Sequence, residues 1–525
     1  MVEQSNLLNW IVFLPLIGMV LCLVAPSAKA VKTIGVATSG LVLLLSLFLF
    51  PPFLSQKFGS SYGTPESMHF AYTADWISVG QFVIRYAVGV DGLSFPMVIL
   101  TTLITFLAAL ASWNFEHWNI NKGIKGYFAL FLLLETGVLG TFVALDFFLF
   151  YIFWEVMLLP MYFLIGVWGG PRKEYAAIKF FIYTFLGSVL ILIALLAMYY
   201  KAADVGVHTF NLLEYATNPQ VREIFNNPDT TFLKFNFGLA MFVMLFIGFA
   251  VKVPLFPFHT WLPDAHVEAP TPISMILAGI LLKLGGYGML RICYPIFPAA
   301  AHSAAYVLAL LGLVNIIYGA LCAMAQSDFK RLVAYSSISH MGYVILGLAI
   351  LTETGVQGAM FQMLAHGISS PMCFFLVGVV YDRAHHRDIN RFGGMWLSMP
   401  VYGSLATLGF FASLGLPGLC GFIGEIWVLL GTFAAPFPWA KPVAIVAAFG
   451  VVLTAGYILW LIQRVYLGRE KAEYANFPDA GAREVFVLSI MGALAIFMGV
   501  LPRYTFNLMN GTLEHIVRLF SSQVS

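Results

Sequence analysis

Charge is scarce in this chain of 525 residues. Lys and Arg together number 27 and Asp and Glu 25, so charged residues make up 10% of the sequence and the formal net charge is +2. A typical soluble domain carries about 25% charge, and a nucleic-acid-binding domain carries a basic surface. The composition therefore excludes a disordered chain, a nucleic-acid-binding protein and an ordinary soluble enzyme.

Cysteine is also rare. No CxxC pair occurs, and no histidine stands at ligand spacing from a cysteine. Neither a disulfide framework nor a structural metal site is expected. We interpret the cysteines as small apolar side chains in or beside apolar runs. They are Cys22, Cys293, Cys322, Cys373 and Cys420.

Hydrophobic residues make up 60% of the sequence. They form long uninterrupted runs instead of alternating ten-residue segments, which is typical of membrane helices and not of outer-membrane barrels. The sequence predicts an all-α polytopic membrane protein with about 14 transmembrane helices. The expected spans are 8–25, 33–50, 92–112, 127–145, 146–168, 176–199, 236–258, 271–291, 304–323, 331–351, 355–380, 397–434, 442–466 and 485–502.

The basic residues predict the topology. Cytoplasmic loops of membrane proteins are enriched in Lys and Arg. The basic loops hold Lys29 and Lys32, Lys122 and Lys125, Arg172 and Lys173, Lys330 and Arg331, Arg383, Arg387 and Arg391, and Arg464, Arg469, Lys471 and Arg483. We expect these loops on the cytoplasmic side of a bacterial inner membrane. Both termini and the long segments after Pro51 and Lys201 should then lie outside, and alternation in residues 70–85 suggests a small β-hairpin there.

Two spans look broken. Pro254 and Pro257 interrupt the seventh apolar run, and Pro417 interrupts the twelfth, so backbone hydrogen bonds are lost at membrane depth. Broken helices at corresponding positions of two halves are typical of transporters. We therefore expect two five-helix repeats, the second inverted relative to the first. The expected division is 1–126 for the N-terminal helices, 127–291 for the first repeat, 304–468 for the second and 469–525 for the C-terminal helix and tail.

A few ionisable side chains fall within the predicted spans. Each costs about 2.5 to 3.5 kcal/mol at mid-bilayer on insertion scales, so each needs a reason. Lys179 lies about one turn from a basic loop, and we expect it to snorkel. The candidates for function are Glu135, Glu155, Lys252, Lys283, His340, His366 and Glu425.

Glu155 and Lys252 form a possible coupling pair if the fifth and seventh spans touch. A nearby carboxylate favours the charged form of a buried lysine, so moving it away favours release of the proton. Glu155 could instead be a buried carboxylate that only joins helices. Glu135, in the fourth span, could extend the input side of a proton path or simply accept a hydrogen bond.

Lys283 interrupts a strongly apolar run, and Glu425 follows the break at Pro417. His340 and His366 fall between them in sequence and suit a proton relay, because imidazole can pass a proton from one nitrogen to the other near neutral pH. The alternative is that both histidines are hydrogen-bonded core residues. Glu425 would be the terminal acceptor or exit gate.

The stretch 258–270 contains four residues that resemble metal ligands: His259, Asp264, His266 and Glu268. Their spacing is not HExxH, and no open coordination pattern is implied. We interpret the stretch as a polar cytoplasmic linker lining a proton path, and not as a metal site.

These residues occur within motifs that resemble a known family, the M subunits of proton-pumping NADH:quinone oxidoreductase, respiratory complex I. The likeness covers nearly the whole chain, and the relatives include the L and N subunits and the D subunit of multi-subunit sodium/proton antiporters. The motifs are residues 89–94 (GVDGLS), 154–155 (WE), 166–170 (GVWGG), 261–270 (WLPDAHVEAP), 281–288 (LLKLGGYG), 335–342 (YSSISHMG) and 421–425 (GFIGE).

The resemblance implies 14 helices in two inverted repeats, with half-channels that meet on a polar axis. By motif, Glu155 and Lys252 would be the coupling pair, Lys283 the central lysine, His340 and His366 the relay, and Glu425 the terminal residue, with Glu135 less securely matched. It also implies that this chain holds no cofactor, and that FMN and iron–sulfur clusters belong to other subunits. The expected partners are the L-type and N-type antiporter-like subunits, protons and membrane lipids.

Two other functions stay open from the sequence. One is a cation/proton antiporter subunit of a multi-subunit antiporter or of a membrane-bound hydrogenase-type complex. The other is a structural spacer of the membrane arm, in which the buried charges carry no proton.

Overall fold

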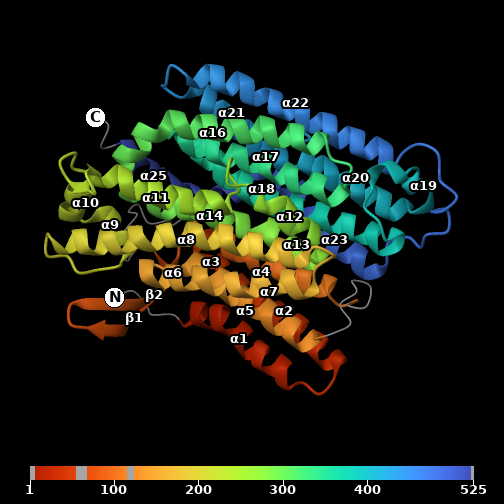
Figure 1. Cartoon of the computed structure of the whole chain (residues 1–525), viewed down its shortest axis with the longest axis horizontal. Helices are drawn as coiled ribbons and strands as arrows, with labels where there is room; N and C mark the ends of the chain where they lie inside the picture. The colour runs from red at the N-terminus through yellow and green to blue at the C-terminus, as the bar shows by residue number, and fades with distance from the viewer. Residues whose placement is uncertain (1–5, 55–67, 115–122, 522–525) are drawn as a thin grey trace.

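The computed structural model describes residues 6–54, 68–114 and 123–521, which are mostly helical (Figure 1). Within these residues, twelve helical segments are long and apolar enough to cross a membrane. They are α1 (Leu7–Val24), α2 (Ala28–Leu47), α4 (Ser94–Ala111), α5 (Ile124–Val143), α6 with α7 (Phe147–Trp168), α8 (Lys173–Ala203), the segment Thr271–Ile296, α16 (Pro298–Met324), α17 (Phe329–Ala349), α18 (Glu353–Ala384), α22 (Ala440–Val465) and α23 (Ala482–Val500).

The two predicted breaks are present. Counting each broken span once, the described helices account for the 14 predicted spans. The broken spans consist of α11 (Phe237–Lys252) with α12 (Trp261–Glu268), and of α20 (Pro400–Leu414) with α21 (Cys420–Ala434). The second half of the first broken span lies beyond the predicted range 236–258, because Pro254 and Pro257 prevent the helix from resuming before Trp261.

Two further irregularities were not predicted. The fifth span is interrupted at Met157, three residues before Pro160, which has no backbone N–H to donate. The eighth span contains two π-helical segments, an arrangement often found at functional sites. Its parts are α13 (Thr271–Ile276), η2 (Leu277–Leu281), α14 (Leu282–Gly288), η3 (Met289–Cys293) and α15 (Tyr294–Ile296).

The predicted hairpin is confirmed and is longer than expected. Strand β1 (His69–Val79) pairs antiparallel with β2 (Phe82–Val90). The remaining elements are short: α3 (Phe50–Leu54), α9 (Leu212–Thr217), α10 (Pro219–Asn226), β3 (Thr231–Phe232), β4 (Phe235–Asn236), η4 (Ile389–Arg391), α19 (Met395–Ser398), α24 (Pro502–Asn507) and α25 (Asn510–Ser521).

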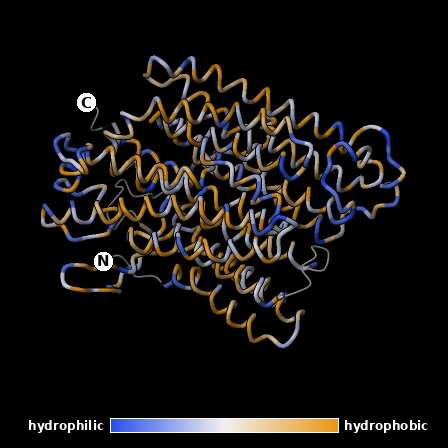
Figure 2. The backbone as a smooth tube through the Cα atoms, in the orientation of Figure 1, coloured by the Kyte–Doolittle hydropathy of each residue, from blue (hydrophilic) through white to orange (hydrophobic). Residues whose placement is uncertain are grey.

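The bundle has two distinct ends. The β1–β2 hairpin, α9, α10 and α25 lie at one end and α19 at the other (Figure 1). Hydrophilic residues are concentrated at both ends (Figure 2). Arg172 contacts Glu268 at 3.8 Å, and Arg387 contacts Asp328 at 3.1 Å and the carbonyl oxygen of Val267 at 2.8 Å. The basic loops that hold Arg172, Lys330 and Arg387 therefore share one end with the stretch 258–270, and which end faces the cytoplasm stays a prediction.

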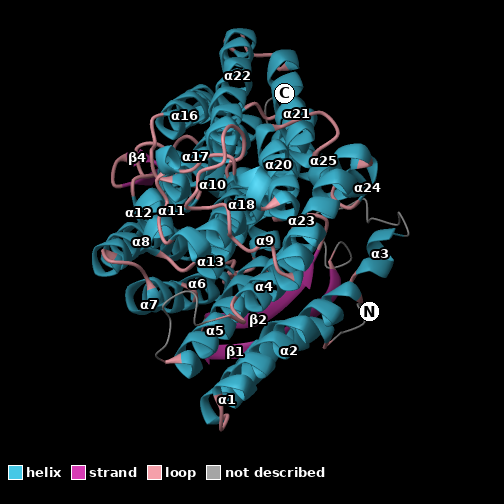
Figure 3. Ribbon diagram, turned by 90° about the vertical axis from the view of Figure 1, so that its right-hand side faces the viewer, coloured by secondary structure: helices cyan, strands magenta, loops and turns pink. Residues whose placement is uncertain are grey.

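The helices are arranged with α1 and α2 along one edge of the bundle and α22 along the opposite edge (Figures 1 and 3). Between them, α16 and α17 approach each other very closely. A Cβ at Gly319 would lie 2.7 Å from the backbone N of Ser339, and one at Gly342 would lie 2.7 Å from that of Ile316. This contact leaves no room for side chains at these positions, so α16 and α17 form a tightly packed pair.

Candidate functional site

Lys283 and His366 form the first contact of the site. Lys283 lies on α14, is fully buried, and its Nζ is 2.6 Å from Nδ1 of His366 on α18. The same Nζ donates a hydrogen bond to the carbonyl oxygen of Ala278, at 2.5 Å. Ala278 belongs to the π-helical segment η2, so the local widening of the helix supplies one partner of the lysine.

His340 and Glu425 form the second contact. Nδ1 of His340, on α17, is 3.0 Å from Oε1 of Glu425 on α21. The other ring nitrogen of His340 lies 3.4 Å from the hydroxyl of Ser413 on α20. The ring centroids of His340 and His366 are 5.7 Å apart. The four predicted residues from Lys283 to Glu425 thus lie in one buried series across four helices.

The second break positions Glu425. The chain turns at Gly415, where φ is +82°, a conformation that side chains other than glycine rarely adopt. A Cβ at Gly415 would lie 2.8 Å from Oε2 of Glu425. The missing side chain therefore leaves the space that the carboxylate occupies.

Lys252 is the last residue of α11 and is 1% exposed. Its Nζ lies over the rings of Trp154 at 5.5 Å and Phe180 at 5.3 Å. Such cation–π contacts stabilise a charged lysine most when it is desolvated. In the described part of the chain, this Nζ has no hydrogen-bond partner.

Glu155 lies next to Trp154 on α6, within electrostatic range of Lys252. The two helices touch through Trp154 and Phe249, whose ring centroids are 5.4 Å apart. Oε1 of Glu155 also lacks a hydrogen-bond partner among the described residues. The structure thus places the predicted pair near each other without a direct contact between Oε1 and the lysine.

Glu135 is fully buried on α5. Its Oε1 accepts a hydrogen bond from the hydroxyl of Thr105 on α4, at 2.8 Å, whereas Oε2 has no partner within the described ranges. The hydrogen-bonding alternative for Glu135 is therefore present in the structure.

The stretch 258–270 is not the polar linker that the sequence suggested. It folds as α12, whose residues are all buried. Asp264 binds Lys179 at 2.7 Å and Arg331 at 3.4 Å. The ammonium of Lys179 thus has a carboxylate partner that the sequence did not indicate, and its expected snorkelling stays a prediction. No cluster of three or more His, Cys, Asp or Glu suited to a metal occurs among the described residues.

Comparison with known proteins decides the family. The family model described as NADH:quinone oxidoreductase/Mrp antiporter, transmembrane, matches residues 144–454, more than half of the chain. NADH-quinone oxidoreductase subunit M of Rhodobacter capsulatus is 39% identical over 99% of this chain and 98% of its own length. The chain belongs to the subunit M family of NADH-quinone oxidoreductase.

Solved structures agree with this assignment. A chain of respiratory complex I from Thermus thermophilus with bound NADH has a TM-score of 0.84 and 30% identity, covering 98% of this chain and 99% of that one. A chain of the Mrp complex from Dietzia sp. has a TM-score of 0.80 at 18% identity, covering 98% and 100%, which shows a shared fold. As a subunit M family member, the chain is a multi-pass integral membrane protein of a respiratory complex.

Two buried residues were not among the candidates for proton transfer, because Lys330 was assigned to a basic loop and His266 to the polar linker. Lys330, 4% exposed, donates a hydrogen bond from Nζ to the carbonyl oxygen of Ala269. His266 is fully buried, stacks on Phe374 with ring centroids 4.2 Å apart, and lies within electrostatic range of both Lys330 and Lys283. Lys330 stands beside Arg331 at a predicted helix start, where basic residues usually only mark topology.

A cavity of about 660 Å³ opens beside these residues, lined among others by Lys330, Glu268, Asp328 and Arg387. It lies among the basic loops that share one end of the bundle. Lys330 therefore lines a polar cavity at that end and lies within electrostatic range of His266.

Asp91 and Arg291 form a buried ion pair that the sequence reasoning also missed. Nη2 and Nη1 of Arg291 donate to the carboxylate of Asp91, at 2.6 Å and 2.8 Å, and the side chains of Asp91 and Arg291 are 2% and 0% exposed. Burial alone would raise the pKa of Asp91, but Arg291 and the backbone N–H donors of Leu93 and Ser94 hold it below its ordinary value. This pair ties the start of α4 to Arg291 in η3, and Arg291 is eight residues after Lys283.

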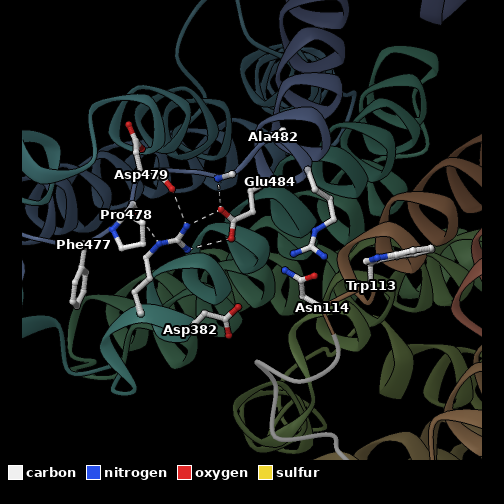
Figure 4. Close-up of a pocket in the computed structure, with 11 residues that line it drawn as sticks. Trp113, Asn114, Asp382, Phe477, Pro478, Asp479, Ala482 and Glu484 are labelled. Atoms are coloured by element: carbon white, nitrogen blue, oxygen red, sulfur yellow. Dashed lines mark hydrogen bonds and ion pairs between the residues drawn. The ribbon is translucent and has the colours of Figure 1, made fainter. Parts of the chain in front are cut away.

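A further pocket of about 670 Å³ lies between the end of α4, the end of α18 and the start of α23 (Figure 4). Arg383 binds Glu484 there through two hydrogen bonds, at 3.1 Å and 2.8 Å. Trp113 and Asn114 line its other side. None of the seven predicted site residues lines this pocket.

Proposed function

We propose that this chain translocates protons across the membrane and that electron transfer from NADH to quinone, in other parts of the complex, drives the process. Family membership makes the chain a subunit of NADH:quinone oxidoreductase, complex I. The observation that carries the proposal is the buried series Lys283, His366, His340 and Glu425. Nζ of Lys283 is 2.6 Å from Nδ1 of His366, the two imidazole centroids are 5.7 Å apart, and Nδ1 of His340 is 3.0 Å from Oε1 of Glu425.

Such a series suits proton transfer for a simple reason. Each imidazole can accept a proton at one nitrogen and release it from the other near neutral pH. Lysine at one end and a carboxylate at the other supply a donor and an acceptor. A series of ordinary core contacts would not need four ionisable side chains, since each is costly to bury in a membrane protein.

Glu155 and Lys252 supply the coupling step in this proposal. At an effective dielectric constant of about 20, moving a carboxylate from about 4 Å to about 8 Å from an ammonium changes their interaction by about 2 kcal/mol. Moving one charge against 100 mV takes about 2.3 kcal/mol. A displacement of Glu155 relative to Lys252 is therefore of the right size to drive one proton toward Lys283.

The remaining parts of the proposal follow from the family and the topology. The two broken spans belong to two inverted five-helix repeats, 127–291 and 304–468, joined by the polar axis. Protons are taken up from the cytoplasmic side, through the cavity that reaches Lys330, and both termini lie outside. The L-type and N-type subunits adjoin this chain in the membrane arm, and FMN and iron–sulfur clusters belong to other subunits. Glu135 extends the input side.

The decisive experiment measures protons pumped per NADH oxidised by the whole complex in proteoliposomes. Lys283→Ala, His366→Ala and Glu425→Gln should each abolish pumping while the complex still assembles. Lys201→Ala, at the end of α8, is the matched control and should pump normally. Full stoichiometry in a site variant would remove that residue from the path. Pumping that required sodium would instead favour a cation/proton antiporter.

A further inference from the structure

Asn315 is a buried amide at the first broken helix. It lies on α16, is 0% exposed, and is the residue against which the break after Lys252 is held. Its Oδ1 accepts a hydrogen bond from the backbone N of Phe256, at 2.7 Å, and its Nδ2 donates to the carbonyl oxygen of Pro254, at 3.1 Å. At membrane depth, backbone groups freed by a broken helix need such partners.

The same amide also reaches α17. Its Nδ2 donates a second hydrogen bond to the carbonyl oxygen of Ile338, at 3.3 Å, two residues before His340. A carboxamide offers two N–H donors and one acceptor oxygen, so Asn315 uses both donors and its oxygen at this junction. Of its partners, Pro254 is two residues after Lys252 and Ile338 is two residues before His340.

Neighbouring contacts keep α17 fixed relative to Asn315. The hydroxyl of Ser339 donates to the carbonyl oxygen of Ile316, at 2.8 Å, and the glycine contacts described above hold α16 against α17. One side chain, Asn315, therefore fixes the position of the break relative to the helix that carries His340.

We propose that Asn315 is a positioning residue for proton transfer, which ties the backbone after Lys252 to the helix of His340. This inference rests on the proposed function, since it assumes that Lys252 and His340 both handle protons. Loss of the amide should uncouple the two parts of the axis without removing any ionisable group.

The test uses the complete complex with three substitutions at this position. Asn315→Ala removes the hydrogen bonds and leaves a void, whereas Asn315→Leu removes them at similar volume. Asn315→Ser retains one hydroxyl that can donate and accept. Ser46→Ala is the matched control, because it removes another buried contact between helices, the 2.9 Å contact to Thr102, far along the sequence from the break.

Substitutions in a coupling network change the coupling equilibrium by about 2-fold or more. Protons pumped per NADH should fall at least about 2-fold in Asn315→Ala and in Asn315→Leu, with quinone reduction retained. Asn315→Ser should recover most of the loss, and Ser46→Ala should pump normally. Normal pumping in the Leu variant, an equal loss in Ser46→Ala, or no recovery with Ser would each overturn the positioning role.

Two further measurements separate the possible failures. Normal pumping in all of Lys283→Ala, His366→Ala and Glu425→Gln would overturn the proposed function itself, whereas loss in those variants with normal pumping in Asn315→Leu overturns only the present inference. If the Ala and Leu variants do not assemble, hydrogen exchange of the wild-type complex decides. The amide of Phe256 should exchange at least about 10-fold more slowly than that of the turn residue Gly206, and equal rates would show that the contact to Asn315 is absent.

Discussion

The buried ion pair between Asp91 and Arg291 makes the strongest prediction about stability. Asp91→Asn leaves the guanidinium of Arg291 buried without its counter-charge. Removing one partner of a buried ion pair costs about 3 to 5 kcal/mol, because the remaining charge stays desolvated. With exposed fractions of 2% and 0%, no solvent is available to replace the carboxylate. We expect Asp91→Asn to destabilise the membrane arm by about that amount.

The hairpin offers a matched control. Asp75 binds Arg85 at 3.1 Å, but these side chains are 68% and 49% exposed. Exposed ion pairs contribute about 0.2 to 1 kcal/mol. Asp75→Asn should therefore have a small effect, although it removes the same carboxylate from the same Asp–Arg pairing.

The assay is thermal denaturation of the purified complex, and the measured signal is the release or aggregation of this subunit. Asp91→Asn should melt well below wild type and Asp75→Asn close to it. The double variant Asp91→Asn with Arg291→Met should recover much of the loss, because it removes both buried charges. Equal melting temperatures for Asp91→Asn and Asp75→Asn would refute the reasoning.

The same pair predicts how this difference depends on pH. The pKa of Asp91 lies below its ordinary value in the folded protein. Its contribution to stability is then fully present above the ordinary pKa, about 3.9, and is lost only as the pH falls through the lower folded value. The difference between wild type and Asp91→Asn should therefore be constant from about pH 6 to about pH 8, and a steep change in that range would contradict the ion pair.

Three shorter predictions test other parts of the structure. Gly415→Ala and Gly418→Ala both place a side chain in left-handed backbone, at a cost of about 1 to 2 kcal/mol each. Only a Cβ at Gly415 would meet Glu425, because nothing lies within 4 Å of a Cβ at Gly418. Pumping should fall only in Gly415→Ala, and equal pumping would contradict this geometry. Asp264→Asn should lower the melting temperature, since the charged hydrogen bond to Lys179 is worth about 1.5 to 3 kcal/mol, and an unchanged value would show that the bond contributes nothing. A maleimide should label Cys322, which is half-buried, faster than the four buried cysteines, and uniform labelling would contradict the helix packing.

Much of the fold could be predicted because the membrane restricts the possible structures. Long apolar runs predict the spans, and prolines such as Pro254 and Pro417 predict where helices break, since they lack the N–H that a helix needs. The π-helical segments beside Lys283 could not be predicted. In a run that is apolar on every side, a local change from 3.6 residues per turn leaves no periodic signal.

Candidate site residues were visible for a similar reason: a charge in an apolar run is conspicuous. Lys330 was missed because a lysine beside Arg331 in a loop looks like a topology signal. For Lys179 the sequence indicated the distance from the loop but not the partner Asp264, 85 residues away. Sequence position gives the depth of a charge in the membrane, whereas its partner depends on which helices pack together.

The packing also restricts where the axis can change shape. His340 is fixed on α17, because α16 and α17 meet at glycines whose replacement by any larger residue would bring a Cβ within 3 Å of the opposing backbone. Lys252, in contrast, is followed by eight residues without regular helix, from Val253 to Thr260, and its ammonium has no hydrogen-bond partner among the described residues. In the proposed mechanism, a displacement that separates or joins Glu155 and Lys252 is therefore expected in α6 and in the Lys252 side chain, while His340 and Glu425 stay in place. Asn315 limits movement of the break itself, because its amide ties the backbone at Pro254 and Phe256 to α17.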